Sequence, residues 1–278
     1  MRCLAIRYGL IALTLLAACA SAPKGPPDDA TLSRLGHAGD AAFKLEQPDQ
    51  AAEQYRAALA RARVRDDAAA IADAGFNLAA AELRAGRAED AMHTAQELQA
   101  ELARRGIADP DFDLVTATAL FRLGQLLAAD RIAAGLAADK DPALADAGWF
   151  LRGLIADKVG NRAGLEQAAA ALSPTANAAD VAELRARLKN DQALALQAAD
   201  LRRDQLDYRG MARALALAAQ FAPSPDAAAD LYLRAARSAA GQGDTAEARL
   251  WLNRARELAP DAGLRTEADN ALHKLPAP

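Results

Sequence analysis

Small residues recur in phase along most of this chain, and short turns separate one set from the next. In the last and most regular unit the small positions are Ala235, Ala236, Ala239, Ala248 and Ala255. Alanine fills 78 of the 278 positions, whereas aromatic residues make up only 4% of the chain. Alanine is the strongest helix former, and the residue types that favour strands are scarce here. The sequence therefore predicts an all-α protein whose helices approach one another closely through small side chains.

The units resemble tetratricopeptide repeats, in which two antiparallel helices touch through small residues and bulky residues fill the space between successive hairpins. In the last unit the bulky residues are Tyr232 and Leu252, and Gly243 with Asp244 marks the turn. The first unit follows the same pattern with Gly39, Ala42, Ala51, Tyr55 and Ala58. The units follow one another at about 36 to 46 residues, which is longer than the 34 residues of the family.

The resemblance implies a superhelical array of about six helix hairpins over residues 31–262, closed by a capping helix and tail over residues 263–278. A generic alanine-rich helical bundle is the alternative. Against that alternative, the small residues and the turn glycines keep the same phase from unit to unit.

Residues 173–191 lengthen one step of the array. Pro174 ends the preceding helix, and Val181, Leu184 and Leu188 mark an additional amphipathic helix. This helix is either a lid over the groove of the array or a plain insertion. We favour the insertion.

The N-terminus has the features of an export signal. Arginines precede an apolar stretch at residues 8–16, which is too short to cross a bilayer as a helix of about 20 residues. The stretch ends in Leu16, Ala17, Ala18 and Cys19. These four residues resemble the lipobox of bacterial lipoproteins, so we expect residues 1–18 to be a lipoprotein signal peptide. The alternative is an ordinary signal peptide that is cleaved after Ala18 or Ala20.

The lipobox resemblance implies that Cys19 becomes the N-terminus and carries the lipid anchor. The other cysteine, Cys3, would be lost with the signal peptide. Ala20 follows the lipidated residue in place of Asp, which implies sorting to the outer membrane, with the protein facing the periplasm. Residues 19–30 contain several prolines and acidic residues and are expected to form a flexible tether.

The residue types that carry catalysis are scarce and scattered. His37, His93 and His273 lie in different units, and none has a second ligand at metal-binding spacing. The acidic run at 109–113 fails as a calcium loop because Leu114 stands where a glycine is required. The net charge of −4 provides no electrostatic basis for binding nucleic acid. The sequence therefore predicts no enzymatic activity, no metal, no cofactor and no nucleic-acid partner.

In tetratricopeptide superhelices the first helix of each unit lines the concave face. Carried onto this chain, the resemblance places there Phe43, Lys44, Phe76, Asn77, Arg84, Phe121, Arg122, Phe150 and Lys158. Such a groove suits a partner peptide or helix with apolar anchors and acidic groups. Alternatively, the basic residues point to solvent and the apolar ones belong to the core. Only Asn77 resembles the carboxylate clamp of the family, so recognition of a chain terminus is not expected.

The two resemblances together imply a membrane-anchored scaffold that binds partner proteins during assembly of an envelope complex, for example pilus or outer-membrane machinery. The alternative is a periplasmic enzyme or ligand-binding module with an unrecognised site in the groove. Acidic or histidine side chains that converge from several helices would favour this alternative, and the sequence alone shows no such cluster.

Overall fold

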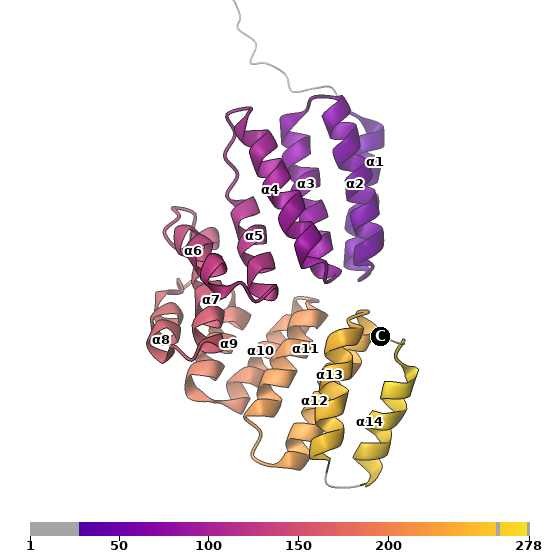
Figure 1. The fold of residues 1–278 in the computed structure, drawn as a ribbon, viewed down its shortest axis with the longest axis vertical. Coiled ribbons are helices and arrows are strands. Elements are labelled where there is room, and N and C mark those ends of the chain that lie inside the picture. The colour runs from indigo at the N-terminus through magenta and orange to yellow at the C-terminus, as the bar shows by residue number, and fades with distance from the viewer. Residues whose placement is uncertain (1–27, 260–261, 277–278) are drawn as a thin grey trace, which may run out of the picture.

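Fourteen α-helices follow one another in the part of the chain that the computed structural model describes, residues 28–259 and 262–276. Their bounds are α1 (Ala30–Lys44), α2 (Pro48–Val64), α3 (Ala68–Arg84), α4 (Ala88–Ala103), α5 (Asp111–Arg122), α6 (Leu126–Leu136), α7 (Pro142–Lys158), α8 (Arg162–Ala171), α9 (Ala178–Lys189), α10 (Gln192–Asp204), α11 (Tyr208–Gln220), α12 (Pro225–Gly241), α13 (Thr245–Leu258) and α14 (Ala262–Lys274). Consecutive helices pack together as antiparallel pairs (Figure 1). This confirms the prediction of an all-α, tetratricopeptide-like array of hairpins.

The array contains about seven hairpins, one more than the sequence pattern predicted. The difference arises because the two helices that were expected as additions also pack on their neighbours, α9 on α10 and α14 on α13. Helix α9 also contacts α7 and α8, and its Leu184 is fully buried there. Residues 173–191, which lengthen the array, therefore add a packed helix between the fourth hairpin and the hairpins that follow it.

Capping side chains and left-handed turn residues decide where the helices begin and end. Asp244 begins α13 by accepting a hydrogen bond from the backbone N–H of Glu247 at 3.3 Å. After α3, α5 and α7 the chain reverses through Gly86, Gly124 and Gly160, whose φ angles are 80°, 75° and 72°. Glycine adopts this conformation without the steric cost that a Cβ brings. The turn glycines seen in the sequence are thus explained by backbone geometry.

Alanine and glycine occupy the positions where paired helices touch. The alanines with 0% of their surface exposed include Ala79, Ala91, Ala95, Ala235, Ala236 and Ala248. Gly39 shows why small residues are needed, because a Cβ built on it would lie 2.5 Å from Cε1 of the Tyr55 ring. The Tyr55 ring can therefore lie against α1 only because residue 39 has no side chain.

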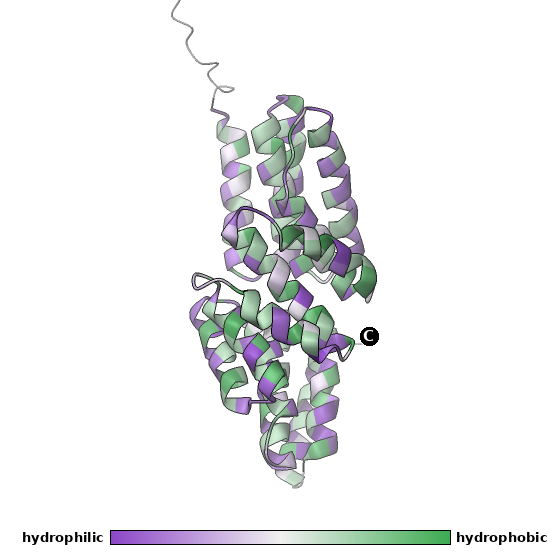
Figure 2. Cartoon of the chain, turned by 90° about the vertical axis from the view of Figure 1, so that its left-hand side faces the viewer, coloured by the Kyte–Doolittle hydropathy of each residue, from purple (hydrophilic) through white to green (hydrophobic). Residues whose placement is uncertain are grey.

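The array bends back on itself. Helices α1–α4, the N-terminal arm, and helices α10–α14, the C-terminal arm, are joined on one side by α5–α9 (Figure 1). The buried apolar residues of the described chain form four clusters, and none of these clusters joins the two arms. Hydrophobic and hydrophilic residues are interleaved along the helices (Figure 2). Among the described helices, none is both long enough and apolar enough to cross a membrane.

Gly135 in α6 and Gly148 in α7, two helices that pack together, are expected to respond in opposite ways to substitution by alanine. A Cβ on Gly148 would lie 2.5 Å from the backbone nitrogen of Ala137, whereas a Cβ on Gly135 would have no atom within 4 Å. Gly148→Ala should therefore destabilise the protein by about 1–3 kcal/mol through overpacking. Gly135→Ala should stabilise α6 by roughly 0.5–1 kcal/mol through helix propensity. Urea unfolding followed by circular dichroism measures both changes. If both substitutions changed the free energy of unfolding in the same direction, this description of the packing would be wrong.

Candidate functional site

A cavity of about 420 Å³ lies between α1 and α3, with α2 beneath it. Its walls are formed by Leu32, Ser33, Gly36, His37, Asp40, Tyr55, Ala58, Ala70, Asp73, Ala74 and Asn77. Most of these residues belong to the first helices of the first two hairpins, the side that the family resemblance assigns to the groove. Asn77 is the residue of the predicted groove set that contributes to this cavity.

Tyr55 on α2 forms the floor of the cavity. Only 4% of its surface is exposed, and its hydroxyl donates a hydrogen bond to Oδ1 of Asp40 at 2.8 Å. Burial, followed by the hydrogen bond to Asp40, raises the pKa of Tyr55 above its usual value, and the charge of Asp73 acts in the same direction. Tyr55 therefore stays protonated and holds the Asp40 carboxylate at the edge of the cavity.

Two carboxylates and a histidine converge at this cavity from different helices. Asp40 and His37 belong to α1, whereas Asp73 belongs to α3 and accepts a long hydrogen bond from Asn77 Nδ2 at 3.4 Å. The arrangement provides hydrogen-bond acceptors for a cationic or donor group. Sequence analysis did not identify Asp40 and Asp73, because each reads as an ordinary solvent-facing acid of its own helix. Only the packing of α1 and α3 on the same helix, α2, brings them together.

The predicted basic and aromatic residues contact one another across successive hairpins. Arg84 lies over the ring of Phe43 at 5.1 Å, and Lys158 lies over the ring of Phe121 at 5.2 Å. Phe150 is covered in the same way by Arg202, at 5.8 Å. A cation above an aromatic face is attracted by the ring quadrupole. These aromatic and basic side chains thus stabilise each other within the array.

The remaining residues of the predicted set have different surroundings. Phe76 packs edge-on against Phe112, with ring centroids 6.4 Å apart, and is only partly exposed. Lys44 is exposed at the end of α1. Arg84 also donates a hydrogen bond through Nε to Glu46 at 3.0 Å.

Arg122 lies at the end of α5 and donates a hydrogen bond to the backbone carbonyl of Leu83. Part of its side chain is exposed to solvent. Desolvation, together with the like charges of Arg213 and Arg209, lowers the pKa of Arg122 to about 10. Both of those arginines belong to α11. Charged side chains of the C-terminal arm therefore act on Arg122.

In the described ranges, no group of three or more His, Cys, Asp or Glu side chains, those at the cavity included, is placed to hold a metal ion. Cys19, the expected lipidation site, lies outside the described residues, as do the signal peptide and most of the tether.

Comparisons with known proteins find matches among solved structures only. No protein-family profile and no curated protein sequence matches the chain. A tetratricopeptide repeat protein from Parabacteroides merdae is 16% identical, covering 88% of this chain and 100% of that one, with a TM-score of 0.45. The TPR2AB domain of yeast Sti1, solved in a complex with pHSP90, is 16% identical over 87% of this chain and 97% of that one, with a TM-score of 0.31. A thermophilic TPR protein from Thermus thermophilus is 18% identical over 87% and 99%, with a TM-score of 0.28. The superpositions are loose, so the description of this fold rests on its own helix pairing.

Removing the hydroxyl at the floor of the cavity should have an effect that depends on pH. Tyr55→Phe loses the bond to Asp40 and should cost about 1–3 kcal/mol of unfolding free energy at neutral pH. Because the pKa of Tyr55 is raised in the folded state, this stabilisation is present below the ordinary tyrosine pKa of 10.0 and is lost as the pH rises above it. The difference between the wild type and Tyr55→Phe should therefore narrow above pH 10 in urea titrations. A difference that stays constant over that range would contradict the proposed environment of Tyr55.

Proposed function

We propose that this chain is a non-enzymatic scaffold that binds an extended segment of a partner protein on the groove side of its first two hairpins. The observation that supports this proposal is the cavity between α1 and α3, where polar side chains from two hairpins converge on one concave site. Tetratricopeptide-like arrays offer such a surface because each hairpin adds a helix to the same side.

The chemistry of the cavity favours a basic side chain of the partner. Asp40 and Asp73 supply two carboxylates, and the carbonyl group of Asn77 adds a further acceptor. The sequence pattern predicts acidic groups on the partner, because four basic residues are expected in the groove. Three of these four residues, Arg84, Arg122 and Lys158, already contact groups of this chain. An acidic partner would compete with those contacts, whereas a basic partner would not.

We also propose that the scaffold is a lipoprotein of the outer membrane that faces the periplasm and assists assembly of an envelope complex such as pilus or outer-membrane machinery. The support for this part is the lipobox-like sequence ending at Cys19, with Ala20 after it and a proline-containing tether up to residue 30. A lipid anchor on a tether of this kind would hold the array near the membrane surface.

A ligand-binding module is the second candidate function. It is favoured by the convergence of His37, Asp40 and Asp73 on one cavity. A small cationic ligand would use the same carboxylates as a basic side chain of a protein, so the two candidates differ in what occupies the site.

Photo-crosslinking in intact cells tests the scaffold proposal. A crosslinking amino acid at His37, in the wall of the cavity, should give a protein adduct of defined mass, and Asp73→Lys should abolish this adduct by reversing the charge of the cavity. The control position is Glu53, which is exposed on α2 and does not line the cavity. The same adducts from both positions, or an adduct that persists in Asp73→Lys, would contradict the scaffold proposal. No protein adduct at His37, together with binding of a cationic small molecule to the purified chain, would favour the ligand-binding module.

The lipid anchor has its own test. Cys19→Ser should abolish incorporation of a fatty-acid probe and shift the protein from the membrane fraction to the soluble or precursor fraction, because the thiol of Cys19 is the group to which the lipid is attached. The paired control is Cys3→Ser, which should label like the wild type. Equal labelling of Cys19→Ser and the wild type would contradict the lipoprotein assignment.

A further inference from the structure

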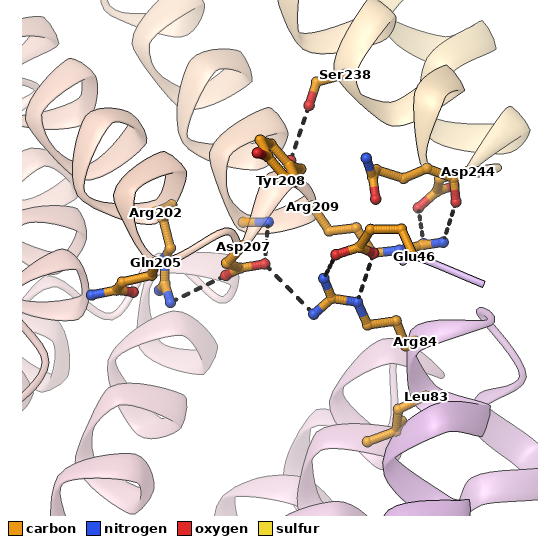
Figure 3. A network of polar contacts seen from close by, with 12 residues as sticks. Glu46, Leu83, Arg84, Arg202, Gln205, Asp207, Tyr208, Arg209, Ser238 and Asp244 are labelled. Carbon is orange, nitrogen blue, oxygen red and sulfur yellow. Dashed lines mark hydrogen bonds and ion pairs between the residues drawn. The ribbon is translucent and has the colours of Figure 1, made fainter. Parts of the chain in front are cut away.

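The turns of the N-terminal arm face the turns of the C-terminal arm. Figure 3 shows Glu46 and Arg84, from the ends of α1 and α3, beside Asp207 and Arg209, from the start of α11. These residues are far apart in the sequence, and only the bend of the array brings them together. We refer to the contacts between these two sets of residues as the inter-arm latch.

Charged groups make up the latch. Nη1 of Arg84 lies 4.0 Å from Oδ1 of Asp207, and Arg84 is also paired with Glu46 on its own arm. On its own arm, Asp207 forms an ion pair with Arg202, whose Nη1 lies 3.4 Å from Oδ2 of Asp207. Arg209 pairs with Asp244 at 3.1 Å; across the arms it is repelled by Arg84 and attracted to a smaller extent by Glu46. The alternating charges that cross from one arm to the other are therefore those of Glu46, Arg84, Asp207 and Arg202.

A second set of charges lies beside the latch and is mixed in sign. Arg122, at the end of the linking helix α5, is repelled by Arg213 and Arg209 of the C-terminal arm and attracted to a smaller extent by Glu247 and Asp244. These charges therefore do not add to the attraction between the arms.

No apolar cluster of the described residues spans the two arms. The closed arrangement consequently lacks the dominant stabilising contribution of buried apolar surface. Partly exposed ion pairs contribute little individually, and salt screens them. The contribution of the latch to the free energy that holds the arms together is therefore small and dependent on ionic strength, whereas the packed helices α5–α9 set the bend.

We propose that the inter-arm latch is a conformational switch that closes the array at low ionic strength and lets the two arms separate when salt screens the charges. It acts on the curvature of the whole array and is independent of the proposed partner site. Arg84 and Asp207 are its central pair, because theirs is the ion pair that joins the arms directly.

Fluorescence energy transfer between the arms tests the switch on the full chain. Gln50→Cys at the start of α2 and Ala246→Cys at the start of α13 place dyes on exposed residues that flank the latch. Cys3 and Cys19 are replaced by Ser in this background. Transfer efficiency should fall between about 0.02 M and 1 M NaCl, because the Debye length shrinks to about 3 Å at the higher concentration.

Substitutions then assign this salt response to the latch. Arg84→Gln and Asp207→Asn should each lower transfer efficiency at low salt and abolish most of the salt response, and the double variant should fall no further than either single variant. Asn can still cap α11, as Asp207 does through Gly210. Circular dichroism should show unchanged helix content in each variant.

Arg203→Gln is the matched control, since Arg203 forms exposed ion pairs with Asp200 and Asp204 on the same arm. It should behave like the unsubstituted protein. The proposal would be overturned by equal transfer efficiency at both salt concentrations in the unsubstituted chain. It would also be overturned if Arg84→Gln kept the full salt response, or if Arg203→Gln lost it.

Discussion

The close approach of paired helices through alanine and glycine is the constraint on which the rest of this structure depends. Helix backbones can come this near only where a side chain is absent or consists of one methyl group, as at Gly39 against Tyr55 and at Gly148 against α6. Such packing fills space with backbone and methyl contacts, so that few large side chains are needed to exclude water. A larger side chain at any of these positions has to push two helices apart, and in an array the displacement would tilt every following hairpin.

The few large aromatic residues are consequently used at the joints between hairpins. Phe43, Phe121 and Phe150 each lie beneath a cation, and two of those cations, Arg84 and Lys158, belong to the next hairpin along the chain. This explains why apolar and basic residues recur together in the sequence at the ends of the first helices. The same pattern would arise in a groove lined for a partner, so the sequence could not distinguish contacts within the array from contacts with a ligand.

The polar cavity and the inter-arm latch have a common origin in the superhelical arrangement. A repeated hairpin places the same helix face next to its counterpart in the following unit, so that Asp40 and Asp73 converge although neither is unusual on its own helix. Over more units the small rotation between neighbours accumulates, and the turns of α3 and α11 come within range of an ion pair. The cavity and the latch therefore both result from stacking: the cavity combines residues of two neighbouring units, and the latch combines residues of units that are distant in the sequence.

The sequence by itself determined the helical class, the hairpin phase and the positions of the turns. These are local properties, because helix propensity, small residues at the contacts of Ala79 and Ala248, and the left-handed glycines Gly86 and Gly124 act within one hairpin. The tertiary structure decided the pairing of α9 and α14 with their neighbours, the cavity above Tyr55 and the partners of Arg84 and Arg122. Those features depend on the angle between successive hairpins, which is the sum of many small packing contacts and leaves no periodic signal in the chain.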